Sequence, residues 1–404
     1  MRPGDHVVWG QAAGEPLTLT RAIVENRKEL QLGGVFVGAA FSDTLRVGNV
    51  DGLSITSYGT MGTTRPLAES GDLQVIPSPI SRIASALREG AIRCDVAVVQ
   101  ISAKGSDGTH SMGPTDDYMR AAIEAARVVL VEINALAPWT YGEPLPNFSK
   151  AALIIETREP LAELSSIPPT GVEKAIGHNV ASLIPDGATL QVGIGGTIDA
   201  MLGCLADHRD LGIHSGAIGD GMIDLILTGA VTNSRKAIDT GISVTAGLFG
   251  SRKMFDHAHC NPNIHLRPYS HTHSAATLTQ IDNLVAVNAA VEVDLSGQAN
   301  AEFANGRYIG GVGGQVDFMH AATRSTSGFS VIALPSTAAH GTISRIRPRV
   351  DTVTCARSEI DFVVTEHGIA DLRCTTIAQR IERIIAIAAP QFREALNAER
   401  NLFF

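Results

Sequence analysis

A cluster of glycines marks the first segment that could do chemistry. The run QVGIGGTID at 191–199 follows an apolar stretch and opens an apparent helix. Glycine permits positive φ and close approach of a ligand to the backbone, and free amides at a helix N-terminus can hold a phosphate or a developing oxyanion. Ile198 replaces the third glycine of a dinucleotide fingerprint, and no P-loop ending follows, so neither nucleotide motif is predicted. A tight turn without a ligand is the structural alternative.

The second segment is the run GGVGGQVDF at 310–318, with four glycines in five positions. Such a loop has almost no side chains to shield its backbone, and ordering it costs considerable chain entropy. We therefore interpret it as a surface for close ligand approach. The two glycine segments together predict a ligand held between two backbone surfaces.

Histidines form a third cluster, between residues 257 and 273. Its potential ligands are His257, His259, Cys260, His265, His271 and His273. These residue types suit zinc, but their spacing matches no closed structural site. We predict no metal here, and expect a solvated loop near the entrance of a cleft that could touch substrate.

The elements that position these segments follow an alternating pattern. Short apolar runs, typical of buried parallel strands, occur at 35–38, 96–101, 128–133, 152–155, 189–192, 285–288, 331–334 and 362–365. Helix candidates lie between them at 80–90, 115–126, 171–184, 197–207 and 376–398. Strands alternating with helices predict βαβ crossovers, and hence an α/β fold with mainly parallel sheets.

Bulk properties limit the class of protein. The 404 residues suggest two domains, and the polar, proline-containing segment SSIPPT at 165–170 places the boundary between 1–165 and 166–404. A net charge of −9 gives no reason to expect binding to nucleic acid or to a membrane surface. Five scattered cysteines, no apolar stretch of spanning length and no signal-peptide pattern lead us to expect a cytoplasmic protein.

Several ordered motifs carry a resemblance to a known family. They lie at 193–200, 211–215 with 220–225, 291–298, 311–318, 333–338, 364–373 and 390–396. The sequence resembles the acetyl-CoA hydrolase/transferase family (family I CoA-transferases), especially its 4-hydroxybutyrate CoA-transferase branch. The match is dense from about residue 170 onward and looser, but collinear, before it.

The resemblance implies two similar open α/β domains with the active site between them. It implies an acyl-CoA:carboxylate CoA-transferase acting on small acids such as 4-hydroxybutyrate, acetate or butyrate. Acyl-CoA and a carboxylate would be its substrates, no cofactor would be bound permanently, and the assembly would be a homodimer or homotetramer. It also implies contacts to CoA and its thioester from Gly193, Ile194, Gly195, Gly196, Thr197, Val291, Gly311, Gly313 and Gly314.

One residue departs from the pattern that the resemblance implies. The family's catalytic glutamate, which forms an anhydride and then a glutamyl-CoA thioester, follows a His-Ser pair. Here that pair is His214-Ser215, and the next residue is Gly216, which has no side chain. His214 could act as a general base, but an orienting or structural role is the expectation because the pair belongs to the pattern itself.

Three alternatives follow from Gly216. Another carboxylate could enter the site, with Glu292 first, then Glu15 and Glu302, although for Glu292 a paired structural role is favoured. The protein could instead be an acyl-CoA hydrolase or C–C bond hydrolase without a glutamyl-CoA intermediate. It could also be a catalytically inactive CoA-binding protein.

Overall fold

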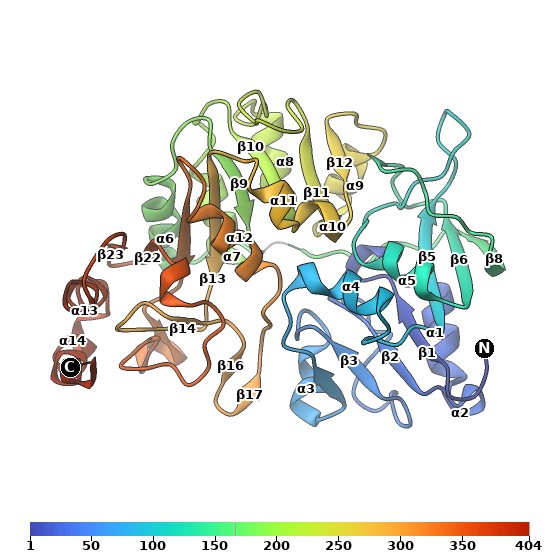
Figure 1. Cartoon of the computed structure of the whole chain (residues 1–404), viewed down its shortest axis with the longest axis horizontal. Helices are drawn as coiled ribbons and strands as arrows, with labels where there is room; N and C mark the ends of the chain where they lie inside the picture. Colours follow the sequence, from blue (N-terminus) through green and yellow to red (C-terminus); the bar gives the residue numbers. More distant parts are fainter. Residues whose placement is uncertain (166, 404) are drawn as a thin grey trace.

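The apolar runs of the first 160 residues form one parallel sheet in the computed structural model, which describes residues 1–165 and 167–403. From one edge to the other its strands are β4 (Leu73–Val75), β3 (Ile55–Ser57), β2 (Gly34–Phe36), β1 (His6–Trp9), β5 (Val96–Ser102), β6 (Val128–Asn134) and β8 (Ala151–Thr157). All of their pairings are parallel. The sheet occupies the blue and cyan half of Figure 1.

Helices cover both faces of this sheet, which explains why its strands are apolar almost throughout. Val96 and Val98 point into a core shared with α1 (Leu17–Glu25) and α3 (Arg65–Ser70). On the opposite face, Ala97 and Val99 pack with α4 (Ile83–Arg88) and α5 (Met119–Ala125). The short α2 (Arg27–Leu30) follows α1.

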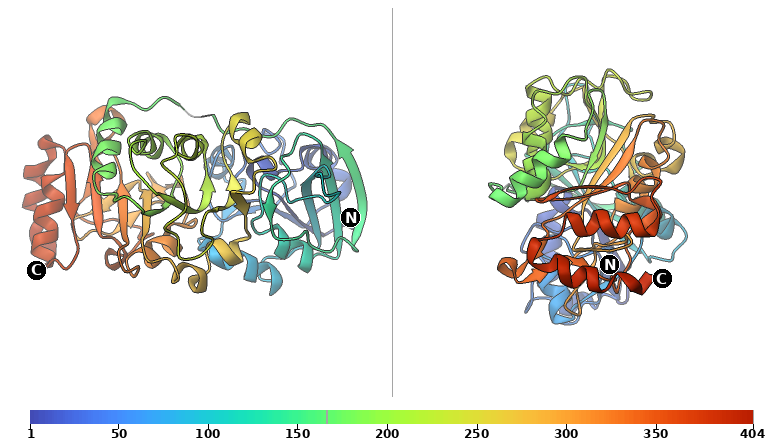
Figure 2. Two further views of the ribbon diagram at one scale, coloured as in Figure 1. Left: turned by 90° about the horizontal axis from the view of Figure 1, so that it is seen from above. Right: turned by 90° about the vertical axis from the view of Figure 1, so that its left-hand side faces the viewer.

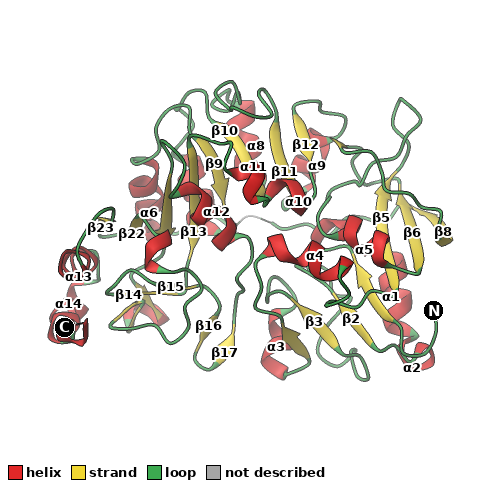
Figure 3. Ribbon diagram, in the orientation of Figure 1, coloured by secondary structure: helices red, strands yellow, loops and turns green. Residues whose placement is uncertain are grey.

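The second half builds a larger sheet of nine strands. Their order is β23 (Gly368–Asp371), β22 (Phe362–Thr365), β18 (Phe329–Ala333), β13 (Leu284–Ala289), β9 (Thr189–Val192), β10 (Gly212–Ile218), β11 (Ser243–Leu248), β12 (Ile264–Leu266) and β7 (Tyr141–Gly142). Only the β22–β23 pair is antiparallel. The prediction of an α/β fold with mainly parallel sheets is confirmed (Figure 3).

Two helical layers cover this second sheet. One core contains Val285 and Val287 with residues of α6 (Gly171–Ala181), α7 (Gly196–Gly203), α8 (Asp220–Leu227) and α9 (Arg252–Ala258). The other contains Leu284 and Ala286 with α11 (Ala275–Leu278), α12 (Gln315–Ala322), α13 (Ile377–Ala386) and α14 (Arg393–Ala398). Between β12 and α11 lies the one-turn α10 (Tyr269–Thr272).

The first half contributes one strand to the second sheet. β7 pairs in parallel with β12, with Tyr141 opposite His265. The chain therefore crosses between the sheets before the polar segment at 165–170, of which Ser166 lies outside the described residues. The division into 1–165 and 166–404 stays a prediction. Figure 2 shows the two ends of the chain at opposite ends of the long axis.

The five expected helices are all shorter in the structure, and two of the differences have a clear local cause. The helix expected at 115–126 begins only at Met119, because Asp117 turns back to accept a hydrogen bond from the Met119 amide at 3.0 Å. The stretch 376–398 is divided into α13 and α14 by Pro390, which cannot donate a helical hydrogen bond.

Short ribbons complete the structure. They are β14 (Glu292–Asp294) with β15 (Ala299–Asn300) and β21 (Ile346–Arg347), β16 (Phe303–Ala304) with β17 (Arg307–Tyr308), and β19 (Thr337–Ala338) with β20 (Ile343–Ser344). Across the described residues, no helix has both the length and the apolar character needed to cross a membrane.

Candidate functional site

A cavity of about 420 Å³ lies where the two halves meet. The first half contributes residues around Tyr58 and Gly62, and the second contributes the ends of β9, β10 and β13. The residues that line it include Tyr58, Arg65, Gly193, Gly216, Tyr269, His273, Val291, Gly311, Gly313, Gly314 and Phe318. Because β9, β10 and β13 are parallel neighbours, their carboxyl ends open toward one edge, where ligands bind in open α/β sheets. We call this space the main cavity.

The first glycine segment forms the turn between β9 and α7. Gly195 has φ of +120°, which favours glycine, and a side chain at Gly196 would collide with Glu173. At Gly193 the situation differs, because a Cβ there would lie 3.6 Å from Asn288 Oδ1, an ordinary contact. Neither backbone conformation nor packing within the chain requires glycine at 193. Close approach of a ligand is the remaining physical reason, since Gly193 lines the main cavity.

The same turn borders a second space of about 340 Å³, which shares Val192, Gly193, Ile194 and Phe249 with the main cavity. Gly195, Gly196 and Asp199 also line it, whereas Thr197 lines neither space. Asp220 stands on its far side, accepting the Ser251 amide at 3.2 Å. Together the two spaces offer a path along the β9–α7 turn.

The second glycine segment links the two halves of the chain. Thr60 donates its amide to Gly310 O at 2.9 Å, and Ile80 donates its amide to Gly313 O at 3.0 Å. A Cβ on Gly311 would lie 2.8 Å from Gly59 Cα. Gly310 and Gly311 are thus explained by backbone-to-backbone packing, a structural reason that the sequence prediction did not include.

The remaining glycines of the loop face the main cavity. Gly313 has φ of +57°, and a Cβ at Gly314 would lie 2.5 Å from His273 Nε2. Arg65 holds the start of the loop by donating to Ile309 O at 2.8 Å. The loop is therefore a wall of backbone held in place at both ends, which suits the close ligand approach predicted from the sequence.

Gly216 lies in β10 at the wall of the main cavity, beside a buried histidine. A Cβ at this position would lie 2.7 Å from both Cε1 and Nε2 of His273. His273 is only 2% exposed, and its ring contacts those of Tyr269 and Phe318, with centroids 4.8 Å apart in each pair. The space that a side chain at 216 would enter is thus filled by the His273 imidazole.

His214 lies behind this wall and does not line the main cavity. It is fully buried, and its Nε2 lies 3.1 Å from Thr272 O. Burial, with a smaller contribution from the Lys236 charge, lowers the pKa of His214 to about 3. A neutral imidazole fixed to the backbone fits the orienting role that the sequence favoured.

None of the three candidate carboxylates lines the main cavity. Glu292 lies 3.7 Å from Arg347 Nε, next to the lining residue Val291. Glu15 is buried and accepts Ser42 Oγ at 2.6 Å. Glu302 is also buried and accepts Thr354 Oγ1 at 2.7 Å. Each carboxylate is engaged within its own half of the chain, so a nucleophilic role for any of them stays a prediction.

Only part of the histidine cluster is the solvated loop that we expected: His259 and Cys260 are exposed and follow α9. His265 lies in β12, and His271 and His273 belong to or follow α10, which packs against β10 and β11. Within residues 1–165 and 167–403, no group of three or more His, Cys, Asp or Glu side chains is arranged to hold a metal. Packing of α10 against the sheet accounts for the positions of His271 and His273.

Two tyrosines were missed as site residues by sequence reasoning. Tyr58 and Tyr269 line the main cavity, and Gln11 joins them by accepting the Tyr58 hydroxyl and donating to Tyr269 Oη. Burial raises the pKa of both phenols. No motif surrounds these residues, and they meet only because the two sheets come together.

Comparisons with known proteins identify the relationship. The model of the acetyl-CoA hydrolase/transferase N-terminal domain matches residues 1–158, and that of the C-terminal domain matches residues 250–400. The 4-hydroxybutyrate coenzyme A transferase of Clostridium kluyveri is 37% identical, over 97% of this chain and 93% of that protein.

Solved structures agree over the whole chain. RipA from Yersinia pestis is 32% identical with a TM-score of 0.90, covering 100% of this chain and 95% of its own. The 4-hydroxybutyrate CoA-transferase of Porphyromonas gingivalis is 36% identical with a TM-score of 0.81, covering 100% and 94%. The chain belongs to the acetyl-CoA hydrolase/transferase family.

Proposed function

We propose that the protein is an acyl-CoA:carboxylate CoA-transferase, which moves coenzyme A from a thioester to a small carboxylic acid. Support comes from the named activities of the relatives, two of which are 4-hydroxybutyrate CoA-transferases. The observation that carries the proposal is the backbone wall formed by Gly193, Gly216 and the 311–314 segment around the main cavity. Such a wall admits a thioester carbonyl close to peptide groups, which can stabilise a developing oxyanion.

The size and charge of the main cavity and of the adjoining space suggest which part of the substrates each one binds. We assign the acyl group and the acceptor acid to the main cavity, and the uncharged pantetheine arm of CoA to the adjoining space. Asp199 and Asp220 line that adjoining space, and their charges disfavour a phosphate there. Acyl-CoA and carboxylate are substrates in this proposal, which includes no permanently bound cofactor.

The residues that line the main cavity indicate which carboxylate attacks the thioester. Among the described residues that line it, none is Asp or Glu. We therefore propose that the acceptor's own carboxylate attacks the thioester carbonyl. The C–S bond breaks, CoA leaves as thiolate, and a mixed anhydride of the two acids remains. The thiolate then attacks the acceptor carbonyl and releases the donor acid.

A panel of short acyl-CoAs, each incubated with and without a second carboxylic acid, tests the function. We expect a new thioester, detected by mass spectrometry, only when both substrates are present. Absence of any new thioester, with acyl-CoA binding intact, would leave the protein as a CoA-binding member of the family.

Borohydride treatment of the same mixtures tests the order of steps. Borohydride reduces an enzyme-bound glutamyl thioester to an alcohol, so a bound intermediate leaves a mass change on one residue. We expect none. A reduced Glu292 would show that this carboxylate, and not the acceptor's, attacks the thioester.

The cytoplasmic location and the homodimer or homotetramer remain predictions. Size-exclusion chromatography with light scattering tests the second of these directly.

A further inference from the structure

Two hydrogen bonds join the start of α12 to the first half of the chain, next to the main cavity. Asp317 Oδ1 accepts Ser81 Oγ at 2.7 Å, and Asp317 Oδ2 accepts the Ser81 amide at 3.2 Å. Ser81 belongs to the short 3₁₀ helix Ile80–Arg82, whereas Asp317 lies in the first turn of α12. One carboxylate of the second half thus takes both donors that one residue of the first half offers. We call this pair the Asp317–Ser81 contact.

The neighbours of this contact along the chain belong to the wall of the main cavity. Ile80, the residue before the serine, donates its amide to Gly313 O at 3.0 Å. Gln315 begins α12 two residues before Asp317, and Phe318 follows it directly. The residues that line the main cavity include Ile80, Gly313, Gln315 and Phe318. Because one turn of an α-helix is held by its own hydrogen bonds, fixing Asp317 also fixes the place where the glycine loop enters α12.

Ser81 and Asp317 themselves line a third space of about 620 Å³, which lies between α4, α11 and α12. This space shares only Tyr269 and His273 with the main cavity. Both residues of the contact are half-buried, so protons reach the carboxylate through this space. Burial lowers the pKa of His273 to about 3, so its ring adds no charge beside the carboxylate near neutral pH.

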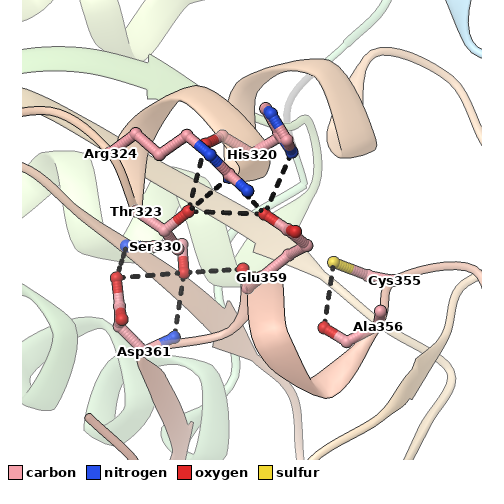
Figure 4. Close-up of polar contacts among 8 residues, drawn as sticks. All are labelled: His320, Thr323, Arg324, Ser330, Cys355, Ala356, Glu359 and Asp361. Carbon is pink, nitrogen blue, oxygen red and sulfur yellow. Dashed lines mark hydrogen bonds and ion pairs between the residues drawn. The ribbon is translucent and has the colours of Figure 1, made fainter. Parts of the chain in front are cut away.

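The cations that line the third space are paired with other acids. His320, one turn further along α12, has its Nδ1 3.3 Å from Glu359 Oε2, and Arg324 donates to the same oxygen at 2.9 Å (Figure 4). Arg88 of α4 is likewise paired with an acidic residue of α5. Burial therefore raises the pKa of Asp317 to about 6, against smaller opposite effects of the serine donors and of His320.

We propose that Asp317 is a positioning residue for acyl-CoA binding: by accepting both donors of Ser81, it holds the start of α12 and the glycine loop 311–314 in the position that the ligand contacts. A protonated carboxyl has a donor on one oxygen and cannot accept both hydrogen bonds in the same way. The loop then occupies its binding position for a smaller fraction of the time, and the apparent affinity falls with that fraction. The inference rests on the proposed function only in placing acyl-CoA against this loop.

The test measures the dissociation constant of butyryl-CoA for wild type, Asp317→Asn and Asp207→Asn at pH values of about 7.5 and about 5, above and below the pKa of Asp317. Asparagine keeps the shape of aspartate but has one acceptor oxygen and no charge. Asp207 is exposed, follows α7 and lines none of the three spaces, so Asp207→Asn is the matched control. The ratio of variant to wild type at each pH cancels the titration of the butyryl-CoA phosphates.

We expect Asp317→Asn to weaken binding roughly tenfold at the higher pH, the scale of one lost hydrogen bond to a charged group, while the control binds as wild type does. At the lower pH the wild-type carboxyl is mostly protonated and resembles the amide, so the ratio should fall below about threefold. A side chain needed only for packing would give the same ratio at both pH values. Circular dichroism at each pH establishes that the variants are folded.

Substitutions at Ser81 test the other side of the contact. Ser81→Ala removes the hydroxyl donor and should weaken binding about threefold or more. Ser81→Thr keeps both donors and should restore the affinity, since its extra methyl can enter the third space. The double variant of Asp317→Asn with Ser81→Ala should bind about as Asp317→Asn alone does, because the two groups form one contact and their effects are not independent.

Four results would overturn the positioning role: equal affinity of Asp317→Asn and wild type at the higher pH, a ratio that does not change with pH, a Ser81→Thr variant as weak as Ser81→Ala, or effects that multiply in the double variant. Transfer is tested separately. Wild type that binds butyryl-CoA but forms no new thioester would refute the transferase proposal and leave the test of Asp317 intact. Wild type that binds no butyryl-CoA would overturn both.

Discussion

The substitution Gly193→Ala tests why the β9–α7 turn has glycine at this position. Glycine could be needed there for a ligand to approach the backbone, or for packing within the chain. The new methyl would lie 3.6 Å from Asn288 Oδ1 and 3.9 Å from Val287 O, both ordinary contacts. No positive φ requires glycine at this position. We therefore expect the free energy of unfolding to change by no more than about 0.5 kcal/mol, as for a substitution without a packing conflict.

The effect on binding should be much larger. Gly193 lines both the main cavity and the adjoining space, so a ligand packed against its backbone would meet the added methyl directly. Overpacking of this kind costs about 1–3 kcal/mol, which corresponds to a roughly 5- to 150-fold weaker affinity. Isothermal titration calorimetry with an acyl-CoA measures the change, and denaturant unfolding measures stability on the same preparation.

Gly203→Ala is the matched control. It lies in the last turn of α7, exposed, with no atom within 4 Å of the added methyl. We expect unchanged affinity and equal or greater stability, because alanine favours the helix. If Gly193→Ala binds acyl-CoA as tightly as wild type, the ligand does not lie against this turn and the assignment of the site is wrong.

Two further predictions concern packing and pH. Gly311→Ala should lower the free energy of unfolding by about 1–3 kcal/mol in urea titrations, because its Cβ would lie 2.8 Å from Gly59 Cα and 2.9 Å from Tyr58 O; unchanged stability would show that the two halves yield easily at this contact. Because burial lowers the pKa of both His214 and His273 from 6.5 to about 3, the unfolded chain binds more protons between these values. Each of these two histidines should therefore lower the free energy of unfolding as pH drops from 6.5 toward 3, by about 1.4 kcal/mol per pH unit. Burial raises the pKa of Asp116 to about 6 and that of Asp117 to about 7, which opposes this slope. The difference between wild type and His273→Gln in urea titrations across this range isolates the contribution of one histidine.

The regular elements were largely predictable from sequence because their residues are patterned locally. The runs at 96–101 and 128–133 are apolar on both faces and became the central strands β5 and β6. Strand β7 could not be foreseen in the same way. It is only two residues long, and its pairing with β12 depends on how the halves meet.

The site was predicted in part. Glycine turns have a local signature, so Gly193 and the 311–314 segment could be named in advance, and both line the main cavity. The packing of Gly311 against Gly59 depends on a contact between residues more than 200 positions apart, which no local pattern carries. The same reason explains why His273 was placed in a solvated loop: only the fold brings it beside Gly216.

The most direct test of the central claim follows oxygen from the acceptor acid. Transfer of CoA exchanges a thioester and a carboxylate, so one carboxylate oxygen of the acceptor must end in the released donor acid. With butyryl-CoA and ¹⁸O-labelled acetate in unlabelled water, the account predicts acetyl-CoA together with ¹⁸O-labelled butyrate. Unlabelled butyrate, with no acetyl-CoA formed, would contradict it, because hydrolysis takes its new oxygen from the water.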